Sequence, residues 1–286
     1  MENSKLLYEK FEEYLQNNLQ SVKSFHPHFE NALTQMLKAG GKRFRPLLLL
    51  NVVVSYEPML IDNSLPIALA LEMLHTYSLI HDDLPTFDDA PLRRGHPTLH
   101  ESYDEVTATL VGDALNSDSF YVISKAPLSS DTKIKLVEEL AKGGGSRGMV
   151  IGQAIDCYFE NKKLSIDELI FLHTHKTAKL IATSLKMGAI IVDLDKKTQD
   201  LLYDIGLKMG LLFQVEDDII DATKSSLEVG KPTNHDGEKN SFTNLLGVDG
   251  AIREKKRLIN ELEVDIEKVD TKLRVRLQKM IDKYFK

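Results

Sequence analysis

Long segments that are apolar on nearly every face are the feature that most limits how this chain can fold. One runs from Pro66 to Asp83 (PIALALEMLHTYSLIHDD) and another from Asp200 to Asp221 (DLLYDIGLKMGLLFQVEDDIID). A helix that is apolar all round is buried among other elements. Short alternating runs bounded by tight turns, which predict strands, are scarce. The sequence therefore predicts an all-α fold, and because no composition break marks a boundary, we expect one domain over residues 1–286.

Proline and serine residues predict where the helices begin and end. Pro66 is expected to be the first residue of a helix, because proline lacks an N–H group and is favoured there. Pro85 should end that helix within a residue or two, since the residue before a proline disfavours the helical conformation. Ser165 and Glu168 have the spacing of a capping box, which predicts the start of another helix.

Two segments interrupt the helical pattern. In KGGGSRGMVIGQ (residues 142–153) each glycine costs a helix interior about 1 kcal/mol relative to alanine. We therefore expect a loop or a helix start at Gly143, with helix again from near Gly148. The polar stretch over residues 223–241 predicts a loop, whose length indicates that it is functional or mobile.

Charge and composition exclude several classes of function. The net charge is −7 with no basic tail, which gives no indication of a nucleic-acid partner. The single cysteine, Cys157, rules out an intramolecular disulfide framework and fits a reducing compartment. The N-terminal residues contain no apolar signal-peptide core, and the longest mostly apolar run, residues 46–56, is too short for a bilayer. We expect a cytoplasmic protein with no integral membrane segment.

Carboxylates lie at the unfavourable end of both apolar segments. Asp82 and Asp83 come late in the first segment, and Asp217, Asp218 and Asp221 end the second. A helix C-terminus carries partial negative charge, so each carboxylate there costs about 0.3–1 kcal/mol before mutual repulsion. A solvated acidic face explains most isolated aspartate pairs, but here both clusters are embedded in apolar helix. The ligand ladder of an EF-hand is absent, so the clusters suggest several Mg²⁺ ions that hold a pyrophosphate between them.

Basic and polar groups suited to an anion accompany the two clusters. His75 lies two helical turns before Asp82, which places it on the same wall of any pocket. A lone histidine is more often a satisfied core residue, and a basic pair is more often solvated, so the interpretation depends on the whole set. The other members are Lys42, Arg43, Arg45, Arg93, Arg94, Lys176, Thr177, Gln214 and Lys231.

Five segments in a fixed order give the chain a close resemblance to one enzyme family. They are GGKRFRP (residues 40–46), LEMLHTYSLIHDDLPTFDDAPLRRG (71–95), GMVIGQAID (148–156), HKTAKL (175–180) and FQVEDDIID (213–221). With these motifs the chain resembles a short-chain trans-isoprenyl diphosphate synthase of the bacterial farnesyl or geranylgeranyl diphosphate synthase type. The resemblance implies a helical bundle around a deep central cavity, a head-to-tail prenyl transfer, and a homodimer.

The resemblance also implies a role for each candidate residue. The metal ligands would be Asp82, Asp83, Asp88, Asp217 and Asp221, joined by Asp218. The allylic diphosphate is assigned to Arg93, Lys176, Thr177, Gln214 and Lys231, of which Thr177 and Gln214 would stabilise the allylic carbocation. Isopentenyl diphosphate is assigned to Lys42, Arg45, His75 and Arg94. Because Pro85 ends the helix, the chain can turn back so that Asp88 joins Asp82, and the loop over residues 223–241 is expected to order on diphosphate binding.

Product length is assigned by resemblance to Tyr77 and Ser78, five and four residues before Asp82. An aromatic residue at the position of Tyr77 goes with a farnesyl product, so we expect the fifteen-carbon diphosphate. Geranylgeranyl diphosphate synthase is the alternative. A terpene cyclase or a non-catalytic helical subunit is more remote, because the residues implied for isopentenyl diphosphate and both aspartate motifs are present.

Overall fold

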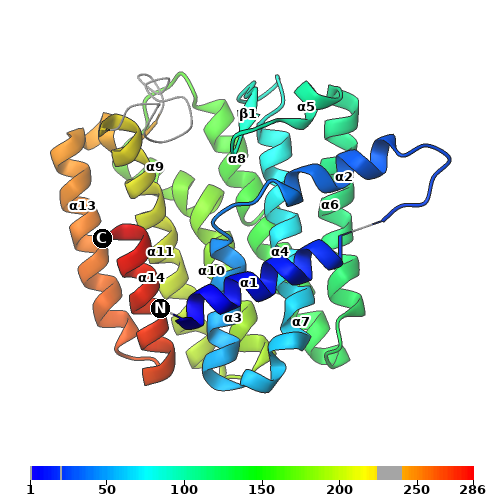
Figure 1. Cartoon of the computed structure of the whole chain (residues 1–286). Helices are drawn as coiled ribbons and strands as arrows, with labels where there is room; N and C mark the ends of the chain where they lie inside the picture. The colour runs from blue at the N-terminus through cyan, green and yellow to red at the C-terminus, as the bar shows by residue number, and fades with distance from the viewer. Residues whose placement is uncertain (1, 20, 224–239) are drawn as a thin grey trace.

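The computed structural model describes residues 2–19, 21–223 and 240–286, and almost all regular structure in them is helical (Figure 1). The expectation of an all-α fold is confirmed. The predicted loop over residues 223–241, with Lys231, lies almost wholly outside the described residues. The helices are α1 (Glu2–Asn17), α2 (His28–Lys38), α3 (Phe44–Tyr56), α4 (Ile61–Asp82), α5 (Leu99–Ser102), α6 (Glu105–Lys125), α7 (Ser130–Gly144), α8 (Met149–Tyr158), α9 (Ile166–His173), α10 (Lys179–Ile191), α11 (Lys196–Thr223), α13 (Phe242–Ile266) and α14 (Thr271–Phe285).

The core forms where the apolar helices pack on one another. α3 lies between α4 and α10, α10 packs along α11, and α6 and α13 cover the outer faces of α4 and α11. Leu48, Leu71, Leu185 and Leu212, one from each central helix, are fully buried. This burial confirms that the two apolar segments are interior helices.

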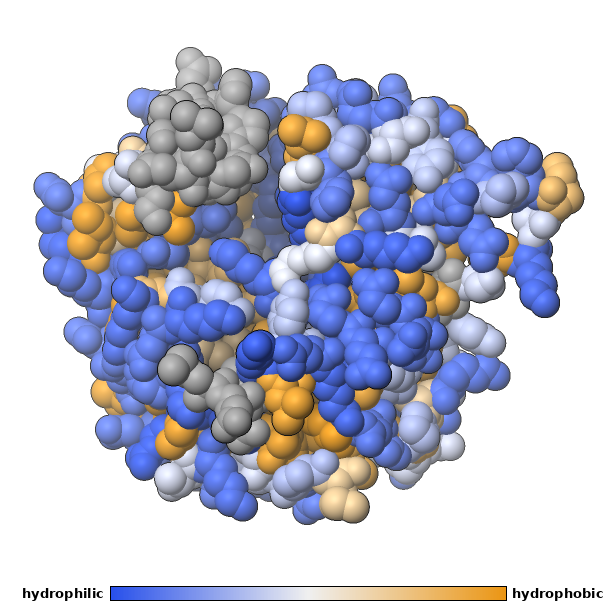
Figure 2. Space-filling model, viewed as in Figure 1, coloured by the Kyte–Doolittle hydropathy of each residue, from blue (hydrophilic) through white to orange (hydrophobic). Residues whose placement is uncertain are grey.

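The C-terminal ends of α4 and α11 lie at the same end of the bundle (Figure 1). Both aspartate clusters are therefore at this end, and the surface there is hollowed, with hydrophilic side chains along much of its rim (Figure 2). The described part of the chain has no helix that combines the length and the apolar character needed to cross a membrane.

A two-residue hairpin follows the first cluster. Strand β1 (Leu92–Arg93) pairs antiparallel with β2 (His96–Pro97). The turn between them has positive φ at both central residues, 55° at Arg94 and 78° at Gly95, as a tight hairpin turn requires. The hairpin fixes the direction of the two neighbouring arginines.

The prediction for Pro66 is wrong. α4 begins at Ile61, directly after a 3₁₀ turn over Pro58–Leu60, so Pro66 lies inside the helix. The missing N–H deprives only the carbonyl of Asp62 of its helical partner. Asp62 is exposed, so water can satisfy that carbonyl and the helix tolerates the proline.

The glycine-rich segment departs from prediction at its start. α7 continues through Gly143, and the chain leaves the helix only over residues 145–148. A Cβ atom at Gly143 would lie 2.2 Å from Oγ1 of Thr183, so close helix packing, not a chain break, requires glycine there. The expected start of helix near Gly148 is confirmed, and so is the capping box of Ser165 and Glu168.

Candidate active site

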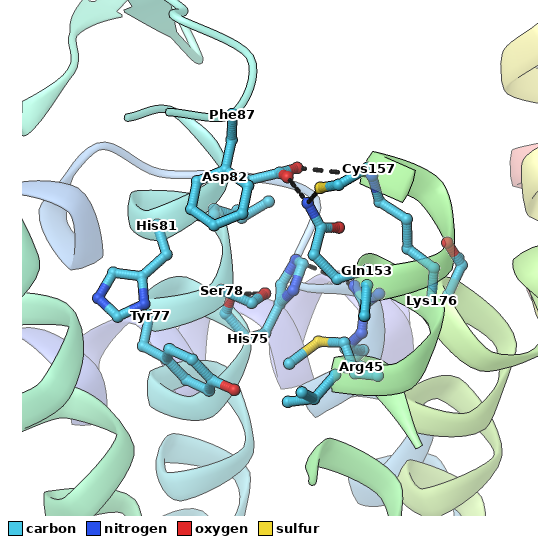
Figure 3. Close-up of a pocket in the computed structure, with 15 residues that line it drawn as sticks. Arg45, His75, Tyr77, Ser78, His81, Asp82, Phe87, Gln153, Cys157 and Lys176 are labelled. Atoms are coloured by element: carbon cyan, nitrogen blue, oxygen red, sulfur yellow. Dashed lines mark hydrogen bonds and ion pairs between the residues drawn. The ribbon is translucent and has the colours of Figure 1, made fainter. Parts of the chain in front are cut away.

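A cavity of about 410 Å³ lies between the start of α3, the second half of α4, α8 and the segment Thr174–Ala178 that precedes α10 (Figure 3). Its lining is mostly apolar in the interior, and polar side chains converge on it from separate helices. The sequence candidates that line it are Arg45, His75, Tyr77, Ser78, Asp82, Lys176 and Thr177, together with Leu79, His81, Phe87, Met149, Val150, Gln153, Ala154 and Cys157. The structure therefore brings candidates from three of the five motifs into one cavity.

The first aspartate cluster is shaped by the end of α4. The helix stops at Asp82, as expected from Pro85, and the chain then folds back on itself. The backbone N–H of Asp88 donates to the carbonyl oxygen of Asp82 over 2.9 Å, and that of Ala90 donates to Asp83 over 3.1 Å. The expected return of Asp88 to Asp82 is confirmed.

Burial disfavours the charged forms of these carboxylates. It raises the pKa of Asp82, although Lys176 acts in the opposite direction. Burial also raises the pKa of Asp83 to about 6, against the pull of Arg93, whose Nε and Nη2 donate to Asp83 over 2.7 and 2.6 Å. The pKa values of both aspartates are raised in spite of these neighbouring cations. Additional positive charge would therefore stabilise their charged forms.

Lys176 and Thr177 stand on a π-helical segment, Thr174–Ala178, that joins α9 to α10. Such segments are rare in proteins, and those that occur are often found at functional sites. Gly152 of α8 lets the two backbones approach, because a Cβ atom there would lie 2.1 Å from the amide nitrogen of Lys176. Lys176 Nζ donates to Asp156 over 2.5 Å and lies 3.9 Å from Asp82 Oδ2. Burial alone would lower the pKa of Lys176, but the two carboxylates outweigh it and raise that pKa.

The second cluster is linked to the cavity through Gln214. The side-chain oxygen of Gln214 accepts a hydrogen bond from Thr177 over 3.2 Å, and its amide donates to Asp218 over 3.1 Å. Asp218 is buried, which raises its pKa to about 7 although the N–H of Phe242 donates to it over 2.7 Å. Asp217 and Asp221 lie on the same last turns of α11.

No three histidine, cysteine or acidic side chains within the described ranges come together as a ready-made metal site. The donor set still fits Mg²⁺, because this ion takes few carboxylates and completes its octahedron with water and substrate phosphate oxygens. Asp82, Asp83 and Asp218 offer only oxygen ligands, and their raised pKa values indicate uncompensated charge. The residues therefore suit Mg²⁺ that arrives with a diphosphate.

Arg45 and His75 form a pair on the α3–α4 side of the cavity. Arg45 Nη1 lies 3.0 Å from His75 Nε2, and since arginine can only donate, Nε2 accepts and the proton is on Nδ1. Burial and the nearby arginines hold the pKa of His75 well below its usual value, so the ring is neutral. Nδ1 of His75 and Nε of Arg45 are buried, and neither has a hydrogen-bond partner within the described part of the chain. Both are therefore buried donors that an acceptor could stabilise.

The remaining basic candidates divide into two groups. Arg94 lies next to this pair, where its Nη1 donates to the carbonyl of Gly40 over 2.5 Å, and Lys42 lies over the ring of Phe213 at 5.2 Å. Arg43 is not available to a ligand. It is fully buried, and its donors bind Glu12, Glu72 and the carbonyl of Leu37 over 2.6–2.7 Å.

The candidates for product length lie on the α4 side of the cavity. Tyr77 is 9% exposed, and its ring contacts the ring of His81 edge to face at 5.7 Å. Gly112 of α6 makes room for His81, because a Cβ atom there would lie 2.1 Å from His81 Nε2. The hydroxyl of Ser78 donates to the carbonyl of His75, which leaves Tyr77 as the bulkier obstacle.

Two polar residues of α8, Gln153 and Asp156, are absent from the candidates predicted from the sequence. Gln153 donates to Asp82, and Asp156 accepts from Lys176, so both lie between the first cluster and the π-helical segment. Their spacing of three in an otherwise apolar helix places them on one face. That pair is the signal that would have identified them.

Known proteins resemble this chain over most of its length. It is 38% identical over 270 residues to the farnesyl diphosphate synthase of Haemophilus influenzae, with 91% of this chain and 90% of that protein covered. It is 40% identical over 239 residues to the chloroplastic geranylgeranyl pyrophosphate synthase of Catharanthus roseus, with 82% and 67% covered. The crystal structure of a geranyltransferase from Helicobacter pylori, complexed with magnesium and isoprenyl diphosphate, matches with a TM-score of 0.94 at 45% identity, over 99% and 97% of the two chains.

A family model described as polyprenyl synthetase matches residues 26–277, which include all five motifs. This match and the curated relatives confirm the resemblance drawn from the motifs. The chain belongs to the polyprenyl synthetase family.

Proposed function

We propose that this chain is a prenyltransferase that condenses isopentenyl diphosphate with dimethylallyl and geranyl diphosphates and gives farnesyl diphosphate. The observation that carries the proposal is the cavity itself. Asp82, Lys176 and Thr177 meet at one part of an apolar chamber, and the Arg45–His75 pair meets it at another. One chamber thus offers separate polar sites for two diphosphates and an apolar space for the prenyl chain.

The allylic diphosphate is proposed to lie between the two aspartate clusters. Several Mg²⁺ ions, on ligands from Asp82, Asp83, Asp88, Asp217 and Asp221, would neutralise the leaving diphosphate. Lys176 carries a fixed positive charge beside Asp82, and Arg93 has guanidinium donors beyond those that bind Asp83. Lys231, outside the described residues, is proposed as a further cation.

Ionisation breaks the allylic C–O bond and leaves a carbocation inside the cavity. Because the hydroxyl proton of Thr177 points to Gln214, the lone pairs of the Thr177 oxygen are free to face the cation. The apolar walls exclude water, which would otherwise capture the cation. Arg45, His75, Arg94 and Lys42 are proposed to hold isopentenyl diphosphate, whose double bond forms the new C–C bond, and the released diphosphate takes the proton.

The test is incubation with isopentenyl and dimethylallyl diphosphates and Mg²⁺, followed by chromatographic sizing of the product. We expect a fifteen-carbon diphosphate and no turnover in EDTA. Asp82→Asn should lower kcat at least about a hundredfold, whereas Asp62→Asn, at the exposed opposite end of the same helix, should leave it unchanged. Absence of a condensation product, or turnover that survives EDTA, would contradict the proposal.

Geranylgeranyl diphosphate synthase is the second candidate, because the Catharanthus roseus relative shares 40% identity with this chain. The bulk of Tyr77 beside the cavity favours the shorter product. The same chromatographic assay separates fifteen-carbon from twenty-carbon products.

We also propose a homodimer in the cytoplasm. Val106, Leu110 and Tyr121 of α6 are exposed by 68%, 51% and 56%, and their helical spacing places them on one face. Light scattering on the purified protein tests the dimer, and cell fractionation tests the location.

A further inference from the structure

Glu72 is a buried carboxylate beneath the proposed isopentenyl diphosphate site. It lies on α4, one helical turn before His75, and is 1% exposed. Its side chain is 2% exposed, against 22% for Arg94, so a ligand in the site meets the arginine rather than Glu72. A buried carboxylate is costly unless it is paired, so its partners should indicate why it is there.

Glu72 interacts with three arginines: Arg45 and Arg94 of the proposed site, and the buried Arg43 behind them. Its Oε1 accepts from Nη1 of Arg43 over 2.7 Å and lies 3.7 Å from Nη2 of Arg94. It also attracts Arg45, which opposes the fall in pKa, to about 10, that burial causes in Arg45. One carboxylate thus acts on three guanidinium groups.

Glu72, Gly40 and Gly41 surround the guanidinium group of Arg94. Its Nη1 donates to the carbonyl of Gly40, and its Cζ lies 2.9 Å from where a Cβ atom of Gly41 would stand. Glu72 is the charged group among these three neighbours. These contacts keep the guanidinium group of Arg94 near Arg45.

The charges in this cluster do not cancel. Arg43 is bound by Glu12 as well as by Glu72, so its charge is offset by these two carboxylates. Glu72 is the carboxylate that acts most strongly on both Arg45 and Arg94, with a weaker attraction of Arg94 to Glu12, and Arg94 also repels Arg45. An excess of positive charge therefore remains for an anion in the cavity.

We propose that Glu72 is a positioning residue for isopentenyl diphosphate, because it orients Arg94 and keeps Arg94 and Arg45 close together. This inference rests on the proposed function. It predicts that loss of the Glu72 carboxylate weakens the binding of isopentenyl diphosphate and not that of the allylic substrate, since the allylic site is built from other residues.

The test compares Glu72→Gln with Glu12→Gln in steady-state kinetics with both substrates varied. Each variant removes one carboxylate from Arg43, but Glu12 is the more exposed of the two and Glu72 is the one that lies within 4 Å of Arg94. We expect Glu72→Gln to raise KM for isopentenyl diphosphate at least about tenfold, with KM for the allylic substrate unchanged. Glu12→Gln should leave both KM values near those of the wild type.

Glu72→Asp keeps the charge but withdraws it by one methylene, and it should give a smaller rise in the same KM. It also serves if Glu72→Gln does not fold. Equal changes in both KM values, or an equal effect of Glu12→Gln, would overturn the inference. Wild-type enzyme that forms no condensation product would instead refute the proposed function, so the two failures are distinguishable.

Discussion

Gly152→Ala tests how α8 positions the π-helical segment that carries Lys176 and Thr177. The new Cβ atom would lie 2.1 Å from the amide nitrogen of Lys176 and 2.5 Å from its Cα. Ordinary van der Waals contact begins at 3.4 Å, so the two backbones must separate by about 1.3 Å. Overpacking of this kind costs about 1–3 kcal/mol, and the better helix propensity of alanine returns about 1 kcal/mol. We expect a net loss of about 0–2 kcal/mol in the free energy of unfolding.

The larger effect should be on catalysis. A displacement of about 1 Å in a catalytic group can lower the rate about a hundredfold, and Lys176 and Thr177 both move with the segment. We therefore expect kcat to fall about a hundredfold at a temperature where circular dichroism shows the variant folded. The loss of kcat would thus exceed anything that partial unfolding explains.

Gly188→Ala is the matched control. A Cβ atom there would lie 2.8 Å from the carbonyl oxygen of Leu49 and 2.8 Å from Cβ of Val52, in the packing of α10 on α3. Gly188 does not line the cavity, so this variant should lose stability and keep its kcat. Wild-type kcat in Gly152→Ala, or an equal loss of kcat in Gly188→Ala, would refute the reasoning.

Three further predictions follow from the same structure. Tyr77→Ala should open the cavity and shift the product to longer chains in the chromatographic assay; an unchanged product would mean that Tyr77 does not limit length. In EDTA-treated protein, the pKa of Asp218, raised from 3.8 to about 7, disfavours its charged form. Asp218 should therefore lower the stability by up to about 4 kcal/mol in urea unfolding as pH rises from about 4 to about 7. Asp218→Asn should make the pH slope shallower without abolishing it, because Asp83 also has a raised pKa. Ser165→Ala should cost about 1 kcal/mol in the same assay, because it removes the capping hydrogen bond to Glu168, and no loss would show that the cap is not stabilising.

The sequence determined the features of this protein that depend on near neighbours in the chain. Apolar residues on every face predicted buried helices, and the capping box predicted the start of α9. Pro85 predicted both the end of α4 and the return of Asp88 to Asp82, because a proline acts sterically on the residue before it. The motif order was enough to identify the family, since the motifs are local strings.

The tertiary structure decided which candidates face the cavity. Arg43 lies in the same motif as Arg45, yet it is buried on two carboxylates. Gln153 reaches Asp82 across 71 positions of sequence, and Gly152 admits a backbone from another helix. Such contacts depend on how separate helices pack against one another, because a close-packed interior requires the surfaces of neighbouring helices to fit together. No local pattern in the chain contains that information.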